Sequence, residues 1–269
     1  LLQTAFRNPL AGPSILGIDS GASLGVAVAM MLFGGSITMG NLSLGGYVFT
    51  ILAALAGAVG IMVLLSVLNA MLRSTVMLLI TGVIISYITG SLISLLQFWA
   101  SHDGLQAYVL WGMGNFSSVS TERLPVFIGL VSIGLVMALL MMKPLDALLL
   151  GDRYAQNLGV DTTRTRHTLL LATGLLSAIT TAFCGPISFI GLATPHMARF
   201  ISPSGSHRSL LPQTMALGAS IALLCNLLCN LPQSSVLPIN VLTPLIGAPV
   251  IVYHTLAPTL SAKMGRGKK

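Results

Sequence analysis

Long apolar runs separated by short polar connections make up most of the chain. A helix needs about 20 apolar residues to cross a bilayer, and six of the runs are clean enough to predict regular spans. Two others contain internal prolines and predict irregular helices, which a membrane tolerates only where protein or a cavity covers the freed backbone groups. The predicted spans are Gly21–Phe33, Tyr47–Leu68, Val76–Phe98, Leu124–Met142, His167–Phe183, Phe189–Phe200, Leu210–Leu231 and Val241–Leu260.

The composition supports this interpretation. Charged residues make up 7% of the 269 residues, apolar residues make up 54%, and the mean hydropathy is +0.91. A soluble globular protein carries roughly 25% charged residues, so this chain has too few to form a surface that is exposed to water on all sides. The sequence therefore excludes a soluble enzyme, a disordered chain and a disulfide scaffold. It predicts an all-α, polytopic membrane helical bundle that forms one integral domain over residues 1–269.

The positive charges are segregated among the connections between the predicted spans. Alternate connections hold twelve of the thirteen Lys and Arg residues, and the other set holds only Arg123, beside Glu122. Basic connections face the cytoplasm, so this pattern places the C-terminus inside. Single basic residues between apolar runs do not form the basic stripe with aromatic residues that nucleic acid requires, so no nucleic-acid partner is predicted.

Residues 146–166 form the longest polar stretch on the predicted cytoplasmic side. Asp152 can cap a short helix that carries Ala155 and Leu158 on one face, and Gly159 would end it. Asp161 can then start another short helix. Two such helices at the membrane surface could dock a cytosolic partner, and an ordinary solvated loop is the alternative.

The other long connection runs from residue 102 to residue 123, on the predicted outer side. Leu105, Tyr108, Val109 and Gly112 have helical spacing. Tyr108 and the nearby Trp111 carry rings that prefer the membrane interface. The pattern predicts a short helix along the outer surface, which either lines a portal for a substrate or anchors the edge of the bundle.

The sequence contains no motif which indicates that the chain itself catalyses a reaction. No Walker-type phosphate loop or His-Glu-x-x-His motif occurs, and Cys184, Cys225 and Cys229 lack the spacing of a zinc site, so no metal site is predicted. None of the predicted spans has an acidic residue at its centre, which disfavours an ion-coupled transporter. Two functions stay open on these residues alone: an ATPase-independent secondary transporter or channel, and an intramembrane enzyme that would need a nucleophile or metal cluster.

Short motifs of glycine, proline and basic residues recur from one end of the chain to the other. The first begins at Phe6-Arg7-Asn8-Pro9, and Trp111-Gly112-Met113-Gly114 and Ala155-Gln156-Asn157-Leu158-Gly159 follow. The most specific one begins at Gly185-Pro186. The motif residues are Asn8, Pro9, Gly185, Pro186, Gly191, Pro195, His196, Arg199, His207, Arg208, Gly247 and Pro249.

In this order the motifs resemble the FecCD-type permeases of bacterial ABC importers for iron-siderophore, haem and cobalamin. The resemblance implies a ten-span fold, of which this chain lacks the first span and most of the second. It also implies two permease copies, two cytosolic ATPase subunits, and a periplasmic or surface substrate-binding protein, in the inner membrane of a bacterium. ATP and Mg would bind to the ATPase partner, with no cofactor on this chain. Transport would proceed by alternating access at a homodimer or pseudo-dimer interface.

The resemblance also assigns roles to particular residues. Residues 146–166 would be the coupling region that docks in the ATPase, and Ser74-Thr75 would help to close the pathway. Three positions depart from the family. Cys225 and Cys229 stand where similar members often carry an acidic and a basic residue, and Val236 stands where they often carry an acidic one. The residues expected to contact the ATPase are Asp152, Arg153, Ala155, Gln156, Leu158 and Gly159.

Overall fold

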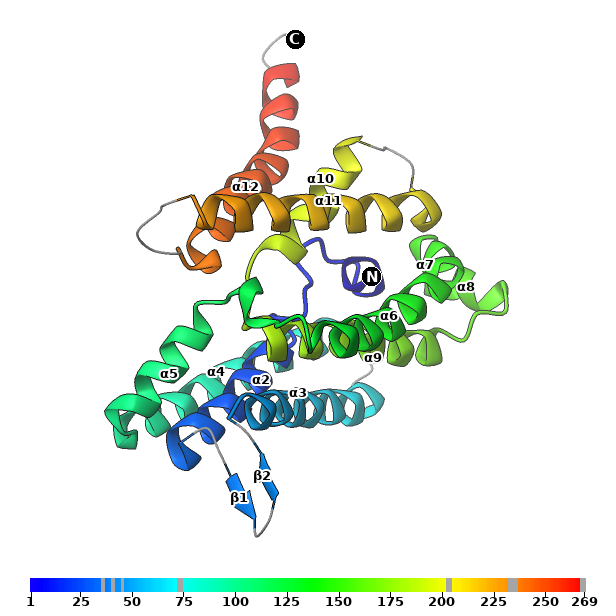
Figure 1. The fold of residues 1–269 in the computed structure, drawn as a ribbon. Coiled ribbons are helices and arrows are strands. Elements are labelled where there is room, and N and C mark those ends of the chain that lie inside the picture. The colour runs from blue at the N-terminus through cyan, green and yellow to red at the C-terminus, as the bar shows by residue number, and fades with distance from the viewer. Residues whose placement is uncertain are drawn as a thin grey trace. The chain divides into compact units, whose positions relative to one another are not determined.

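A computed structural model describes most of the chain, and it is almost entirely helical (Figure 1). This confirms the predicted all-α class, with one short antiparallel hairpin of β1 (Ile37–Met39) and β2 (Leu42–Leu44). The helices form two compact units, Leu1–Pro186 and Ile187–Lys269, which are treated separately below. The described residues are 1–34, 37–39, 42–44, 46–71, 75–201, 205–231 and 237–266.

The first unit holds most of the helices, and the second unit holds the last three. The first contains α1 (Leu2–Ala5), α2 (Ile18–Ala27), the π-helical turn η1 (Val28–Leu32), α3 (Gly46–Met71), α4 (Thr75–Trp99), α5 (His102–Gly112), the 3₁₀ turn η2 (Phe116–Ser118), α6 (Leu124–Leu140), α7 (Met142–Leu149), α8 (Asp152–Asn157) and α9 (Thr162–Cys184). The second contains α10 (Ile190–Ile201), α11 (His207–Cys229) and α12 (Ile239–Arg266).

Within the described ranges, four helices are long and apolar enough to cross a membrane: α3, α4, α9 and α11. The predicted run Leu124–Met142 ends at Leu140 instead, because the chain bends by 43° between α6 and α7, and this bent pair would make a fifth span. Two other predicted spans fall on short helices, Ile18–Leu32 (α2 with η1) and α10, whereas α12 extends over the whole predicted span Val241–Leu260. The ten-span count stays a prediction.

Helix α9 is the most enclosed of the candidate spans. Its best 18-residue window is 61% buried, whereas the corresponding windows of α3 and α4 are 17% and 22% buried. It packs against α2, α3 and α6, and Figure 1 shows α6 and α9 running side by side. Small residues permit this packing, since a Cβ atom on Gly134 of α6 would lie 2.7 Å from the side chain of Leu176.

Helices α2 and α3 cross at very short range through small residues. Gly21 and Gly25 stand one turn apart on α2, opposite Ala53 and Gly57 of α3. A Cβ atom on Gly57 would overlap the carbonyl oxygen of Gly21, and one on Gly25 would overlap the carbonyl oxygen of Ala53. Small residues spaced by four let helix backbones approach each other in membranes. The glycines therefore fix the distance between these two helices.

The second unit is built on a similar contact between α10 and α12. A Cβ atom on Gly247 would lie 2.9 Å from Cβ of Phe189 and 3.5 Å from Cβ of Ala193. Asn240 adds a polar tie, because its Oδ1 accepts a hydrogen bond from the backbone N–H of Ser188 at 3.1 Å. Gly247 and Asn240 thus hold α12 against the beginning of α10.

Candidate coupling site

The polar stretch predicted as the coupling region contains one short exposed helix, α8, between two sharp turns. Gly159 follows α8 with φ +82°, a left-handed conformation in which glycine carries no Cβ penalty. The Gly159 N–H donates to the Gln156 carbonyl at 2.9 Å, and the Val160 N–H donates to the Ala155 carbonyl at 3.0 Å. This paired arrangement is a Schellman helix end. It confirms the prediction that Gly159 ends the helix.

Asp161 and Asp152 both stand at helix starts, but the details differ from the prediction. Asp161 is the N-cap of α9 itself, where its carboxylate accepts from the Arg164 N–H at 3.0 Å. The predicted second surface helix is therefore the first turn of the long helix α9, which starts five residues before the predicted span His167–Phe183. Asp152 is not a cap, because Gly151 occupies the N-cap position and Asp152 is the first residue of α8.

The prediction that Ala155 and Leu158 share one face of the helix is also wrong. Ala155 is fully buried, whereas Leu158 lies at the C-cap and is 59% exposed. Leu158 belongs to an exposed surface with Arg153, Tyr154 and Gly159, while Gln156, although exposed, reaches Thr162 of α9 with its Nε2. A shallow groove of about 480 Å³ beside it is lined by Arg7, Leu150, Gly151, Asp152, Arg153, Tyr154 and Asn157.

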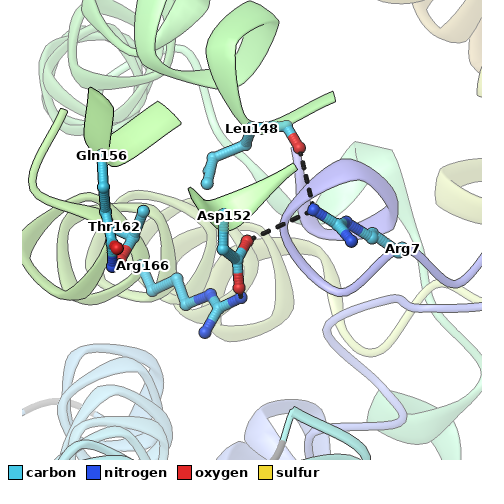
Figure 2. Close-up of polar contacts among 6 residues, drawn as sticks. All are labelled: Arg7, Leu148, Asp152, Gln156, Thr162 and Arg166. Atoms are coloured by element: carbon cyan, nitrogen blue, oxygen red, sulfur yellow. Dashed lines mark hydrogen bonds and ion pairs between the residues drawn. The ribbon is translucent and has the colours of Figure 1, made fainter. Parts of the chain in front are cut away.

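Asp152 is held between two arginines from distant parts of the first unit (Figure 2). Arg166 of α9 donates from Nη2 to Oδ2 at 2.7 Å, and Arg7, after α1, lies with Nη2 3.4 Å from Oδ1. Arg7 also approaches the Leu148 carbonyl of α7 at 3.5 Å. The carboxylate therefore connects α8 to α9 and to the N-terminal segment.

The motif Asn8-Pro9 explains how Arg7 reaches this position. Arg7 follows Phe6, the C-cap of α1, and has φ +47°, which is unusual for a residue with a side chain. Asn8 then closes a turn in which its Oδ1 accepts from the Leu10 N–H at 2.9 Å. The motif thus reverses the chain immediately after the arginine.

The signature at Gly185-Pro186 lies at the other end of α9. Gly185 has φ +78°, and a Cβ atom there would lie 2.5 Å from the carbonyl oxygen of Trp111 at the end of α5. The Asn115 N–H donates to the Cys184 carbonyl at 2.8 Å and closes the same junction. The short helix predicted in this connection is confirmed as α5, whose N-cap Ser101 accepts from the Gly104 N–H at 3.2 Å, and its place on the outer side stays a prediction.

The two ends of α9 differ in charge. About 34 Å separates them at 1.5 Å per residue, and Arg166 lies near the first end. At the second end Arg123 is the nearby basic residue, and its guanidinium carbon lies 3.8 Å from the centre of the Tyr47 ring. Tyr47 in turn donates to the Phe183 carbonyl at 3.2 Å. The first end thus gathers Arg7, Arg164 and Arg166 around Asp152 and Asp161, whereas Arg123 is the arginine described at the second end; which end faces the cytoplasm stays a prediction.

The remaining predicted site residues fall elsewhere. Ser74 and Val236 lie outside the described residues, and Thr75 is described only as the first residue of α4. Pro195 lies inside α10 and Arg199 in its last turn, while His196 and His207 are each 2% exposed. Cys225 and Cys229 are buried on one face of α11. The other motif residues of the second unit are Gly191 in α10, Arg208 in α11, and Gly247 and Pro249 in α12.

Asp19 is an acidic residue that the sequence analysis missed. Helix α2 begins at Ile18, before the predicted start at Gly21, and so includes Asp19 in its first turn. Its carboxylate accepts hydrogen bonds from Ser14 at 2.5 Å, from Thr181 at 3.3 Å and from Ser177. Ser177 stands seven residues before the end of α9, about 10 Å inside it. A carboxylate therefore lies within the helical bundle.

We expect Asp19→Leu to lower the free energy of unfolding by about 1–3 kcal/mol, because three hydroxyl donors lose their acceptor. Asp19→Asn should cost less, since an amide oxygen still accepts. Thermal unfolding of the purified variants in detergent measures both. Ser23→Ala is the matched control, because Ser23 donates only to the Asp19 backbone carbonyl in the same helix. A wild-type midpoint for Asp19→Leu would show that the cluster adds no stability.

The described part of the chain brings no three His, Cys, Asp or Glu side chains into a cluster that could hold a metal ion. The polar groups at the coupling site instead form ion pairs and hydrogen bonds with one another.

Comparison with known proteins identifies the family. The model of the FecCD transport family matches residues 1–257. The vitamin B12 import system permease protein BtuC of Klebsiella pneumoniae is 35% identical over 257 residues, 95% of this chain and 75% of that protein. BtuC of Salmonella typhi is 33% identical over the same length, 95% of this chain and 76% of that protein.

A solved structure agrees with these relatives. An inward-facing metal-chelate type ABC transporter matches with a TM-score of 0.82 and 32% identity, over 94% of this chain and 80% of that one. The match in fold and the match in sequence both extend over nearly the whole chain. This confirms the resemblance that the motifs indicated: the chain belongs to the FecCD transport family.

Proposed function

We propose that this chain is the transmembrane permease of an ATP-driven importer for a metal chelate or a cobalamin-like compound. The observation that carries the proposal is the continuous match to vitamin B12 permeases and to a metal-chelate transporter. As a permease subunit, the chain leaves ATP hydrolysis to a separate ATPase, which binds ATP and Mg. Its own task is to open a path for the cargo alternately to each side of the membrane.

The proposed assembly contains two copies of the permease, two cytosolic ATPase subunits and a substrate-binding protein. The exposed surface of α8 is the proposed contact with the ATPase, because it is polar, outward-facing and flanked by Gly151 and Gly159 turns. The exposed apolar faces of α3 and α4 suit lipid or the second permease copy. A soluble protein would bury apolar faces of this kind, whereas a membrane protein can expose them to lipid.

The proposed location is the inner membrane of a bacterium, with α8 and the C-terminus on the cytoplasmic side. Two observations support this orientation. Twelve of thirteen basic residues fall in alternate connections, and the end of α9 near α8 carries Arg166 and Arg7. Positive charge marks the cytoplasmic side.

Cobalamin is the first cargo to test, ahead of haem and ferric siderophores, because both cited BtuC relatives are named for vitamin B12 import. The experiment reconstitutes the permease with its ATPase and binding protein in vesicles and supplies each labelled cargo in turn. We expect that one of the cargoes is taken up and that its uptake requires hydrolysable ATP. A non-hydrolysable ATP analogue is the control.

Two results would contradict the proposal. Uptake at the same rate without ATP or without the ATPase would favour the alternative function, a secondary transporter or channel. Failure of all three cargo classes to enter, in a complex whose ATPase is active, would reject the proposed cargo chemistry.

A further inference from the structure

Two side-chain contacts join α8 to α9 in a regular pattern (Figure 2). Asp152 contacts Arg166 at 2.7 Å, and Gln156 Nε2 donates to Thr162 Oγ1 at 3.2 Å. On each helix the two residues are four apart and therefore lie on one face. The first residue on α8 pairs with the later residue on α9, so the two helices run antiparallel with one contact per turn.

The α9 side of these contacts is largely buried, whereas on α8 the Asp152 side chain is 42% exposed and Gln156 is exposed. Ala155 is fully buried, so a small side chain lies on the inner face of α8 between Asp152 and Gln156. The Arg166 side chain is 25% exposed and Thr162 is 7% exposed, so both partners on α9 are largely withdrawn from water. A charge-assisted hydrogen bond in such surroundings is stronger than one on an open surface.

A third contact fixes the same carboxylate from the opposite side. Arg7 approaches Oδ1 of Asp152, while Arg166 approaches Oδ2. Arg7 is 56% exposed and its contact is longer, at 3.4 Å, so it is the weaker of the two. The α8–α9 contact through Arg166 is therefore the principal one.

We propose that α8 and the first two turns of α9 move as one rigid unit, with the Asp152–Arg166 pair as the positioning contact that passes motion of the ATPase to the membrane helices. The inference rests on the proposed function of α8. It extends that function because α9 as a whole packs against α2, α3 and α6, so displacement of α8 would reach these three helices through α9.

The first test is a double-mutant cycle in the reconstituted complex, with Asp152→Asn, Arg166→Gln and the double variant. The measured quantity is ATP hydrolysed per cargo molecule imported, together with recovery of the ATPase during purification. We expect each single variant to raise this ratio at least about 5-fold while the complex still assembles. The double variant should be no worse than the worse single, because one contact is lost in all three.

Arg164→Gln is the matched control. Arg164 lies in the same first turns of α9, but it pairs with Asp161 on its own helix and is 89% exposed. We expect it to leave the ratio unchanged, and Arg166→Lys, which keeps the charge, to recover part of the coupling. If Asp152 served only the amino terminus of α8 as a favourable charge, Arg166→Gln would have no effect, and this result would overturn the proposal.

A locking experiment covers the case in which the Asp152 variants do not assemble. Gln156→Cys and Thr163→Cys, both at exposed positions, joined by a flexible bifunctional thiol reagent, would fix α8 to the first turn of α9, and the three native cysteines are buried and out of its reach. Helices that already move together should tolerate the link, so import should stay within about 2-fold of the unlinked variant. Loss of import on linking would show that α8 must move relative to α9 and would reject the rigid unit.

The outcomes separate this inference from the proposed function. Without ATP-dependent import by the unaltered complex, the proposed function fails. With such import and an unchanged ATP-to-cargo ratio in both single variants, only the rigid unit fails.

Discussion

Gly57→Ala is expected to lower the free energy of unfolding by about 1–3 kcal/mol, because the added methyl overlaps the carbonyl oxygen of Gly21. The overlap is with backbone and not with the tip of a flexible side chain. Helices α2 and α3 must therefore separate, which also disturbs α9, since it packs against both. The thermal midpoint and the yield of monodisperse protein in detergent measure the loss.

The same helix supplies the control for this prediction. Gly60 is exposed on α3, and a Cβ atom there would meet no described atom within 4 Å. Gly60→Ala should be neutral or should stabilise the protein by up to about 1 kcal/mol through the higher helix propensity of alanine. Equal effects of Gly57→Ala and Gly60→Ala would show that the two helices do not cross closely.

Gly159→Val is expected to abolish the stimulation of ATP hydrolysis by cargo while the permease remains in the membrane. A β-branched residue is a severe outlier at φ +82°, at a cost of roughly 1–2 kcal/mol, so the turn after α8 would change direction. The position is exposed, and a Cβ atom there would meet no described atom within 4 Å, so the core should be unaffected. Hydrolysis in reconstituted vesicles, with and without cargo, measures the effect.

Gly159→Asn is the control that distinguishes strain in the backbone turn from the effect of adding any side chain at this position. Asn adopts the left-handed region several-fold more readily than most residues, so Gly159→Asn should keep most of the stimulation. Full stimulation in the Gly159→Val variant would reject α8 as the coupling helix. Equal loss in both variants would show that the side chain, and not the turn, causes the defect.

The sequence predicted the long helices well where apolar residues run without interruption. Tyr47–Leu68 and Val76–Phe98 correspond closely to the spans Gly46–Leu68 and Val76–Trp99, because hydropathy alone defines such segments. The polar ends were less well placed. Thr162 and Thr163 begin α9 although they are hydrophilic, since the Asp161 cap and packing in the bundle stabilise that first turn.

The local turn chemistry of the coupling site could also be predicted. Gly159 and Asp161 were assigned correctly as a helix end and a helix start, because both act through the backbone within a few residues. The partners of Asp152 could not be predicted in this way. Arg7 lies 145 positions from Asp152, and only the tertiary structure brings the two together.

Asp19 was missed for a related reason. Asp19 and Ser20 stand directly before the apolar run, so the predicted span began after them, at Gly21. In the structure, hydroxyl groups of Ser177 and Thr181 on α9 accommodate the carboxylate. A polar residue opposite polar residues of another helix cannot be recognised from one segment alone.

The enclosure of α9 has a consequence for how the protein is made. Its mean hydropathy of 1.5 is well below the 2.7 of α3 and the 2.2 of α4, although α9 is buried far more deeply in its unit. A segment so rich in threonine gains little from lipid by itself, and its hydroxyls are accommodated by neighbouring helices. Insertion of α9 into the bilayer should therefore depend on earlier segments already being present. Biogenesis would then follow chain order, with α2 and α3 preparing the place that α9 fills.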